Sequence, residues 1–314
     1  MDLFVNSIAV VSLIFLVLSC IEVGSNDATN LVNAVFGSRV LTRKKAVIIA
    51  GFFVVLGSSF STPVMNTVRK SIFDIHQLDL YMSLSVFVAA YLVGTILLYV
   101  YSIFGMPVST TATLVFCLAG GALGVLGSSS AVNWPKFGQV VLAIILSIFF
   151  SGFFAYFIQR AFRFIIGKDS QNHQVLLKHG GWVTSFMLIA LFWFMASKGM
   201  KHVAFMKAIL TTYNSYSFVV MMVASWGLLA VLISLLLRLG GPLVTRHLFH
   251  VVSVMGMGCM AFAFGQNDLA NCASPGIAVF MIWSQGLMES LKVSVPIWAL
   301  GGCGVLMFFG MLTQ

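Results

Sequence analysis

GSNDATN, residues Gly24 to Asn30, places an acid and two amides directly after an almost uninterrupted apolar run. The chain repeats this pattern as GQNDLAN, Gly265 to Asn271, with the glycine, the Asn-Asp pair and the closing asparagine at the same offsets, again behind an apolar run. A charge at membrane depth costs about 3 kcal/mol or more, so it is usually retained for function. The matched pair therefore indicates an internal repeat with a functional acid in each copy.

The composition is that of an integral membrane protein. Of the 314 residues 60% are hydrophobic and 8% are charged, whereas a soluble domain carries about 25% charged residues. Apolar runs lie at about residues 3–21, 46–60, 81–104, 110–126, 140–158, 182–196, 218–237, 248–264 and 293–312. A spanning helix needs about 20 residues, so the runs predict an all-α bundle in which the shorter segments are tilted, broken or re-entrant.

The charged residues and cysteines exclude several classes of function. The net charge of +9 comes from Lys and Arg between the apolar runs, as cytoplasmic loops require, so nucleic-acid binding is not expected. The five cysteines lack metal-ligand spacing. No nucleophile with a base is evident, so the chain is not expected to be an enzyme or to hold a prosthetic group.

The first motif reads as an interrupted membrane helix. Gly24–Asn26 is a helix-breaking, capping sequence, while Asp27 and Asn30 are three apart and share a helical face. A broken helix inside the protein is therefore predicted, since transporters coordinate ions with backbone groups freed at such breaks. Glu22 corresponds to Ala263 in the second copy, so it is expected to be merely interfacial.

A hydroxyl-rich helix start is predicted in MPVSTTATL, residues 106–114. Pro107 disfavours helix just before it, and Ser109 is a good N-cap. The hydroxyls of Thr110 and Thr111 would then converge with free backbone N–H groups at one helix start. That arrangement favours binding of a tetrahedral oxyanion.

The order of the apolar runs predicts an inverted repeat. Seven crossings separate the starts of the two motif helices, so the second motif should have the opposite orientation to the first. The basic loop 37–46 is assigned to the cytoplasmic side. The predicted organisation is a first repeat over residues 1–166 with both GSNDATN and PVSTT, a cytoplasmic linker over 167–181, intervening helices over 182–246, and the start of the inverted second repeat over 247–314.

These motifs together resemble a known family. GSNDATN followed by GSRVLTRKKA, then PVSTT, then GQNDLANCASPGIAVF, is similar to the inorganic phosphate transporter family, which includes sodium- or proton-coupled phosphate permeases and some bacterial sulfate permeases. The family motif is a glycine, a variable residue, Asn-Asp, two further residues and Asn, once in each inverted half. The resemblance covers most of the chain.

The resemblance implies roles for the motif residues. The carboxylates of Asp27 and Asp268, with the neighbouring Asn30 and Asn271, would bind the coupling cation. Amides, hydroxyls and helix ends would hold the anion. The side chains expected to contact it are Asn26, Ser109, Thr110, Thr111 and Asn267.

The function predicted from the sequence is secondary active transport of inorganic phosphate with sodium by alternating access. The protein is expected to be multi-pass in the cell membrane, with lipid, phosphate and sodium as partners and a homodimer as a possible assembly. Two alternatives stay open, a proton-coupled sulfate permease and an anion channel in which the same residues line a continuous pore.

Three departures from the family pattern bear on this prediction. Ala112 stands where many relatives have histidine, and Val54 stands about where many have glutamate. Both leave the coupling ion open between sodium and proton, and the substrate open between phosphate and sulfate. PVSTT begins 83 residues after the first motif (Pro107 against Gly24), so its partner is expected near position 348, beyond Gln314, and the second repeat is expected to be cut short.

Overall fold

The computed structural model describes residues 3–62, 64–65, 80–167, 172–196, 208, 215–285 and 295–313. Within these ranges the regular elements are helices and no strand occurs. Five of the described helices are long and apolar enough to cross a membrane, and two shorter apolar ones accompany them. The predicted all-α class is confirmed.

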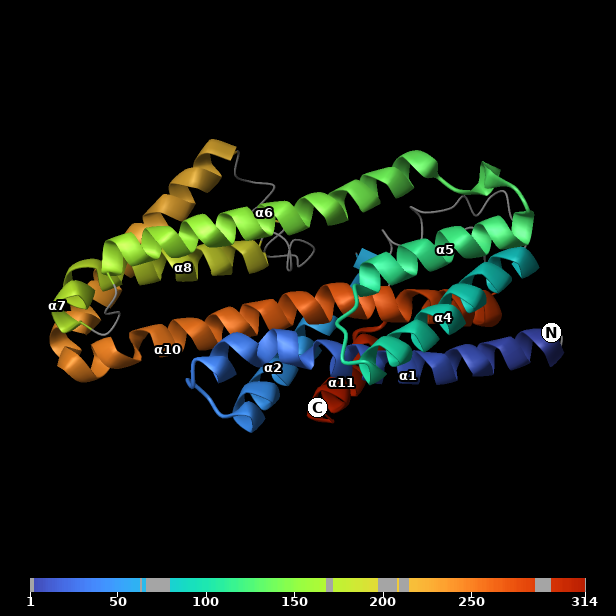
Figure 1. Cartoon of the computed structure of the whole chain (residues 1–314), viewed down its shortest axis with the longest axis horizontal. Coiled ribbons are helices and arrows are strands. Elements are labelled where there is room, and N and C mark those ends of the chain that lie inside the picture. The colour runs from blue at the N-terminus through green and yellow to red at the C-terminus, as the bar shows by residue number, and fades with distance from the viewer. Residues whose placement is uncertain are drawn as a thin grey trace. The chain divides into compact units, whose positions relative to one another are not determined.

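The helices follow the apolar runs of the sequence (Figure 1). The run at 110–126 coincides with α5, and the runs at 218–237 and 248–264 belong to one element, α10. The elements are α1 (Leu3–Gly37), α2 (Arg43–Ser58), α4 (Leu80–Ile103), α5 (Thr110–Leu126), η2 (Ser129–Ala131), α6 (Trp134–Ile166), α7 (His173–Val175), η3 (Leu176–Gly180), α8 (Gly181–Phe194), α10 (Ser215–Gln285) and α11 (Ile297–Leu312).

The chain divides into two compact units. The first unit comprises Met1–Asn33, Arg43–Ile145 and Met260–Gln314, and the second comprises Ala34–Thr42 and Leu146–Cys259. All nine candidate site residues predicted from the sequence lie in the first unit.

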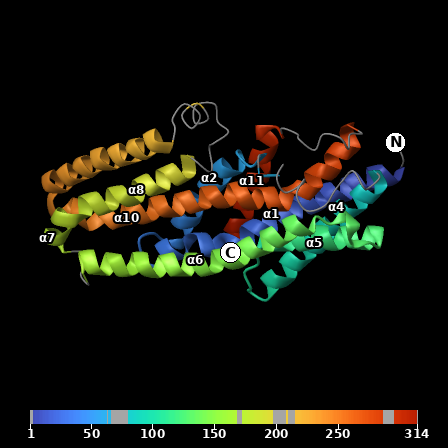
Figure 2. The ribbon, with the colours of Figure 1, turned by 90° about the horizontal axis from the view of Figure 1, so that it is seen from above.

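The second unit is organised around a reversal of α10. Gly241 has φ 61° and ψ −156° inside this element, a backbone conformation that glycine adopts without strain. α10 doubles back at one end in both views (Figures 1 and 2). The described residues of the linker predicted at 167–181 are mainly helical, forming α7 and η3 ahead of α8. His173 Nδ1 lies 3.0 Å from Thr245 Oγ1.

Both motif helices run through their motifs without interruption. α1 is helical from Leu3 to Gly37, and α10 has its one non-helical residue at Gly241, far from GQNDLAN. The prediction of a broken helix at GSNDATN is therefore wrong. The physical reason is that the motif glycines serve helix packing: a Cβ at Gly24 would overlap the carbonyl oxygen of Met307, and one at Gly265 would overlap that of Val54.

Two further glycines make the reciprocal contacts. A Cβ at Gly310 on α11 would overlap the carbonyl oxygen of Ile21, and one at Gly57 on α2 would overlap that of Phe262. α1 therefore packs on α11 through a glycine from each helix, and α10 packs on α2 in the same way. Such close backbone approach requires residues without a Cβ.

The two sets of contacts are related by constant offsets. Gly24 and Ile21 on α1 correspond to Gly265 and Phe262 on α10, which lie 241 positions later (265 minus 24). Val54 and Gly57 on α2 correspond to Met307 and Gly310 on α11, which lie 253 positions later (307 minus 54). Each motif helix thus packs on the helix that lies close after the other motif, α1 on α11 and α10 on α2.

Replacing the motif glycine Gly265 by alanine should destabilise this crossing. The added methyl meets backbone of α2, which cannot rotate away, so we expect a loss of about 1–3 kcal/mol and a lower melting temperature. Gly256 on the same helix has no atom within 4 Å of its added Cβ, so Gly256→Ala should be neutral or gain up to about 1 kcal/mol. Melting of both purified variants in detergent tests this, and equal melting temperatures would refute the packing role.

Candidate functional site

The hydroxyl-rich helix start lies where α4 gives way to α5. α4 ends at Ile103, the following residues are non-helical with Gly105 at φ 64°, and α5 begins at Thr110. Ser109 caps α5 by accepting a hydrogen bond from the Ala112 backbone N–H at 3.3 Å. The prediction that PVSTT starts a helix is confirmed.

Asn26 on α1 holds the connection between α4 and α5. Its Nδ2 donates to Ser102 Oγ at 2.8 Å and to the Met106 carbonyl oxygen at 3.2 Å, and its Oδ1 accepts from the Val108 backbone N–H at 3.2 Å. Both ends of the amide are engaged. The first motif therefore fixes the approach to the start of α5.

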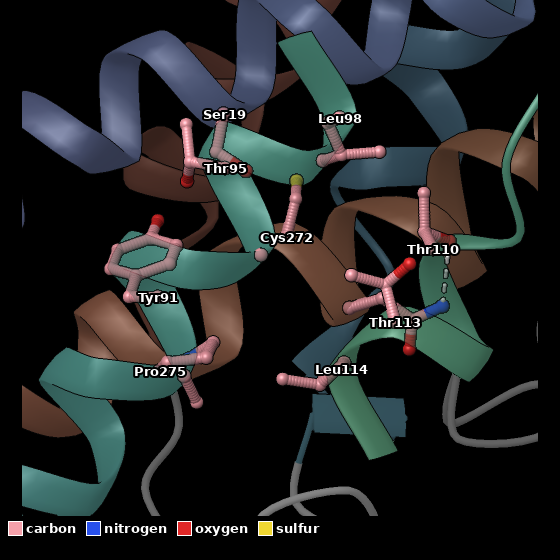
Figure 3. A pocket seen from close by; sticks show the side chains of 12 residues that line it. Ser19, Tyr91, Thr95, Leu98, Thr110, Thr113, Leu114, Cys272 and Pro275 are labelled. Atoms are coloured by element: carbon pink, nitrogen blue, oxygen red, sulfur yellow. Dashed lines mark hydrogen bonds between the residues drawn. The ribbon is translucent and has the colours of Figure 1, made fainter. Parts of the chain in front are cut away.

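A hydrogen-bonded network joins the second motif to the same helix start. The Thr110 hydroxyl donates to Asp268 Oδ1. Asn271 Nδ2 donates to Thr111 Oγ1 at 2.7 Å and to Thr110 Oγ1 at 3.2 Å (Figure 3), and lies 3.5 Å from Asp268 Oδ1. Thr110 and Asn271 are buried, so the network fixes α10 against α5.

The remaining motif side chains are more open. Asp27 and Asp268 are half-buried, and Asn30 and Asn267 are exposed. Asn30 Nδ2 donates to Asp27 Oδ1 at 3.0 Å, whereas Asn267 Nδ2 donates to the Ala263 carbonyl of its own helix at 3.0 Å. Equivalent residues of the two copies thus make different contacts.

One cavity of about 650 Å³ collects seven of the nine residues singled out in the sequence. Asn26 and Asn271 do not line it. Asn26 holds the 102–108 connection, and Asn271 lies buried beside the threonines. The lining residues from the sequence prediction are Asp27, Asn30, Ser109, Thr110, Thr111, Asn267 and Asp268.

The cavity combines two carboxylates with hydrogen-bond donors and lacks a basic side chain. Its lining contains no Lys, Arg or His among the described residues. The positive end of the α5 dipole and the free N–H groups of its first turn face the same region as the threonine hydroxyls. Such a site suits an anion and cations together. The cations would balance the two carboxylates and the anion, for which the lining supplies no basic side chain.

Sequence reasoning missed the apolar wall and the glycine contacts behind this site. Leu31, Met260 and Phe264 contribute apolar side chains to the lining of the cavity. The sequence does contain a signal for these contacts: two glycines lie six residues apart in α2 (Gly51 and Gly57) and again in α11. This spacing does not stand out as a repeat, because the residues between the two glycines differ between α2 and α11. Val54 is buried, and its backbone contacts Gly265; nothing in the structure explains why valine stands at this position.

Comparison with known proteins agrees with the motifs. The sequence model described as the phosphate transporter family matches residues 23–314. A protein of Pyrococcus abyssi provisionally named a phosphate permease is 33% identical over 302 residues, which cover 90% of this chain and 69% of its own length. A protein of Pyrococcus horikoshii with the same provisional name is 32% identical over 293 residues, with the same two coverages.

A solved structure shares the fold. It is named the sodium-dependent phosphate transporter, and it superposes with a TM-score of 0.77 at 20% identity, covering 97% of this chain and 74% of its own. The two chains therefore have the same fold.

The contacts of Asn26 and Asn267 predict opposite outcomes for the same substitution. Asn26→Ala leaves the Val108 N–H and the Met106 carbonyl without their partner, so we expect a loss of about 1–3 kcal/mol of stability. Asn267→Ala removes an exposed side chain and should change stability by about 0.5 kcal/mol or less. Melting temperatures of the two variants in one detergent check this, and equal losses would contradict the role of Asn26.

Proposed function

The chain belongs to the phosphate transporter family, and from that premise we propose that it carries inorganic phosphate across the cell membrane together with sodium. Family membership and the apolar helices make it a multi-pass membrane transporter and not an enzyme. The observation that carries the proposal is the single cavity in which the acids of both motif copies face the hydroxyl-rich start of α5.

The charges in the cavity favour entry of the anion together with cations. An anion about 4 Å from one carboxylate is repelled by about 4 kcal/mol per unit charge at an effective dielectric constant of about 20. The cavity holds two such carboxylates, Asp27 and Asp268, and no basic side chain lines it in the described part. Cations bound at the acids would offset both repulsions, so the anion would enter only with them.

We assign the cations to the acid-amide pairs of the two motifs. Carboxylate and amide oxygens suit a hard cation such as sodium. Asp27 with Asn30 would form one binding element and Asp268 with Asn271 the other. The members of each pair lie one helical turn apart and in hydrogen-bond range at 3.0 Å and 3.5 Å respectively.

We assign the anion to the start of α5. Ser109, Thr110 and Thr111 offer hydroxyls there, and the first-turn N–H groups and helix dipole favour negative charge. Asn267 is exposed at the same cavity and can donate from its amide. Asn26 is assigned to position the loop that leads into this helix, because both ends of its amide are already bonded.

The proposal also specifies sodium as the coupling ion and alternating access as the transport mechanism. Sodium is supported by the name of the structural neighbour, the sodium-dependent phosphate transporter. Alternating access is supported by the reciprocal glycine contacts, which give the two motif helices equivalent packing partners. An inverted repeat of this kind can open its shared site to either side by exchanging the two arrangements.

Neutralising either motif acid should strongly reduce coupled transport. Asp27→Asn and Asp268→Asn remove a charged cation ligand, so we expect sodium-driven uptake of radiolabelled phosphate by proteoliposomes to fall about tenfold to a hundredfold. Folding should survive, since asparagine has nearly the same shape. Melting and reconstitution yield serve as controls.

Imposed gradients distinguish the proposal from its rivals. Accumulation of phosphate against its gradient that stops when sodium is removed supports the proposal. Accumulation driven by protons alone would replace sodium as the coupling ion. Accumulation of sulfate in preference to phosphate would replace phosphate as the substrate. Passive flux indifferent to both gradients would show a channel. Full sodium-driven uptake by either asparagine variant would remove that acid from the cation site.

Removing two hydroxyls should affect the anion more than the cation. In the double variant Thr110→Ala, Thr111→Ala the phosphate loses two donors at the start of α5, so its half-saturating concentration should rise about tenfold or more. The sodium concentration for half-maximal uptake is the internal comparison and should change less. An equal change in both would contradict the assignment of these threonines to the anion.

A further inference from the structure

Charge is divided between the two compact units. The acidic side chains that the structure describes are Glu22, Asp27 and Asp268, and all of them lie in the first unit. Glu22 is 6% exposed, so the expectation that it is merely interfacial is wrong. The described residues of the second unit include no aspartate or glutamate. Its described arginine and lysine side chains are Arg39, Arg160, Arg163, Lys178, Arg238 and Arg246.

The end of α6 brings one of these arginines beside the second segment of α10. The ring of Phe162 packs on that of Phe249, with the two centroids 6.5 Å apart. Arg163 directly follows Phe162 on α6, and Arg246 lies one helical turn before Phe249 on α10. Both arginines are exposed. The packing of the two rings therefore places both arginines at the same end of the unit.

η3 and the turn of α10 before its reversal add Lys178 and Arg238 to this end. A Cβ added at Gly180 in η3 would lie 3.2 Å from Leu237 Cδ1 on α10. Lys178 stands two residues before this glycine, and Arg238 directly follows Leu237. Both basic side chains are exposed. Figures 1 and 2 show the end of α6, α7 and the reversal of α10 together at one end of this unit.

Exposed apolar side chains stand directly beside the basic ones. Phe164 follows Arg163 and is 90% exposed. Leu239 follows Arg238 and is 78% exposed. Along α6 the exposed apolar surface continues away from this end through aromatic side chains that include Phe157. A soluble anion would use only the charged groups, whereas a phospholipid presents an anionic head group next to acyl chains. The combination of charge with exposed apolar surface therefore favours a lipid.

We propose that this end of the second unit binds the head group of an anionic phospholipid through Arg163, Lys178, Arg238 and Arg246. The guanidinium groups suit the phosphodiester oxygens because each can donate two parallel hydrogen bonds. The acyl chains lie along the exposed apolar surface of α6 and α10. This end includes the linker 167–181, which is predicted to be cytoplasmic, and the cytoplasmic leaflet carries the anionic lipids. A bound head group offsets the repulsion among the basic side chains and holds α6 against α10.

Binding of fluorescent phosphatidylglycerol to the purified protein in an uncharged detergent tests the site. The double variant Arg163→Gln, Arg246→Gln removes two basic groups that each contribute about fivefold near anionic lipid, so the affinity should fall about twentyfold or more. The matched control Lys44→Gln, Lys45→Gln removes the same charge from exposed positions at the start of α2, in the first unit. Its affinity should change about twofold or less, because charges outside the site are screened by salt.

A third variant separates loss of charge from loss of folding. Arg163→Lys, Arg246→Lys keeps both charges, so it should still bind the lipid, and its melting temperature without added lipid shows that it is folded. Loss of binding by this folded variant, unchanged binding by the glutamine variant, or an equal loss in the matched control would overturn the site. Phosphatidylcholine bound as tightly as phosphatidylglycerol would do the same.

Competition with soluble glycerol phosphate tests the choice of a lipid. We expect it to displace the fluorescent lipid only at a far higher concentration, because it lacks the acyl chains. Displacement at an equal concentration would overturn the lipid in favour of a soluble anion. The measurement is of lipid binding, so it judges this site whether or not the protein carries phosphate with sodium.

Discussion

Three carboxyl groups in the membrane part of the first unit have no basic side chain to balance them. Glu22, Asp27 and Asp268 lie on helices whose described residues in this unit carry no lysine, arginine or histidine. A charge without a counter-ion in an apolar bundle costs several kcal/mol, so a cation or proton from outside the protein would stabilise each acid. The proposed coupling of an anion to an external cation therefore rests on the folded apolar bundle, whose described residues around these acids supply no basic side chain.

The packing of the motif helices brings two of these acids to one cavity. Had α1 and α10 been broken at their glycines, the freed backbone would have been the binding element. Instead Gly24 and Gly265 let the continuous helices approach the backbones of α11 and α2, and the acids three residues later are held by that contact. The proposed binding consequently uses side chains and the start of α5, the one helix terminus among the described residues that line the cavity.

The sequence predicted the repeated motif, the all-α class and the helix start at PVSTT because each has a local signal: fixed offsets, long apolar runs, and proline before a serine cap. It did not predict the continuity of α1, since Gly-Ser-Asn breaks a helix locally and only the carbonyl of Met307 on a distant helix explains the glycine. It also gave both copies of the motif the same role. Asn26 bonds the loop before α5, whereas Asn267 bonds its own helix. This difference depends on which segments pack beside each asparagine, and the matching offsets of the motifs do not reveal it.

This difference between the copies bears on how the two ligands would influence each other. The Thr110 hydroxyl donates to Asp268, so the proposed anion-binding and cation-binding groups share a hydrogen bond. A cation at Asp268 competes with that hydroxyl for the carboxylate oxygen, and a released hydroxyl can donate to phosphate instead. Each ligand would then strengthen binding of the other by the same factor, because a coupling free energy is reciprocal. Among the described residues, Asp27 makes no corresponding hydroxyl bond and instead accepts from Asn30 of its own motif. The cation at the second motif would therefore be the one most directly coupled to the anion.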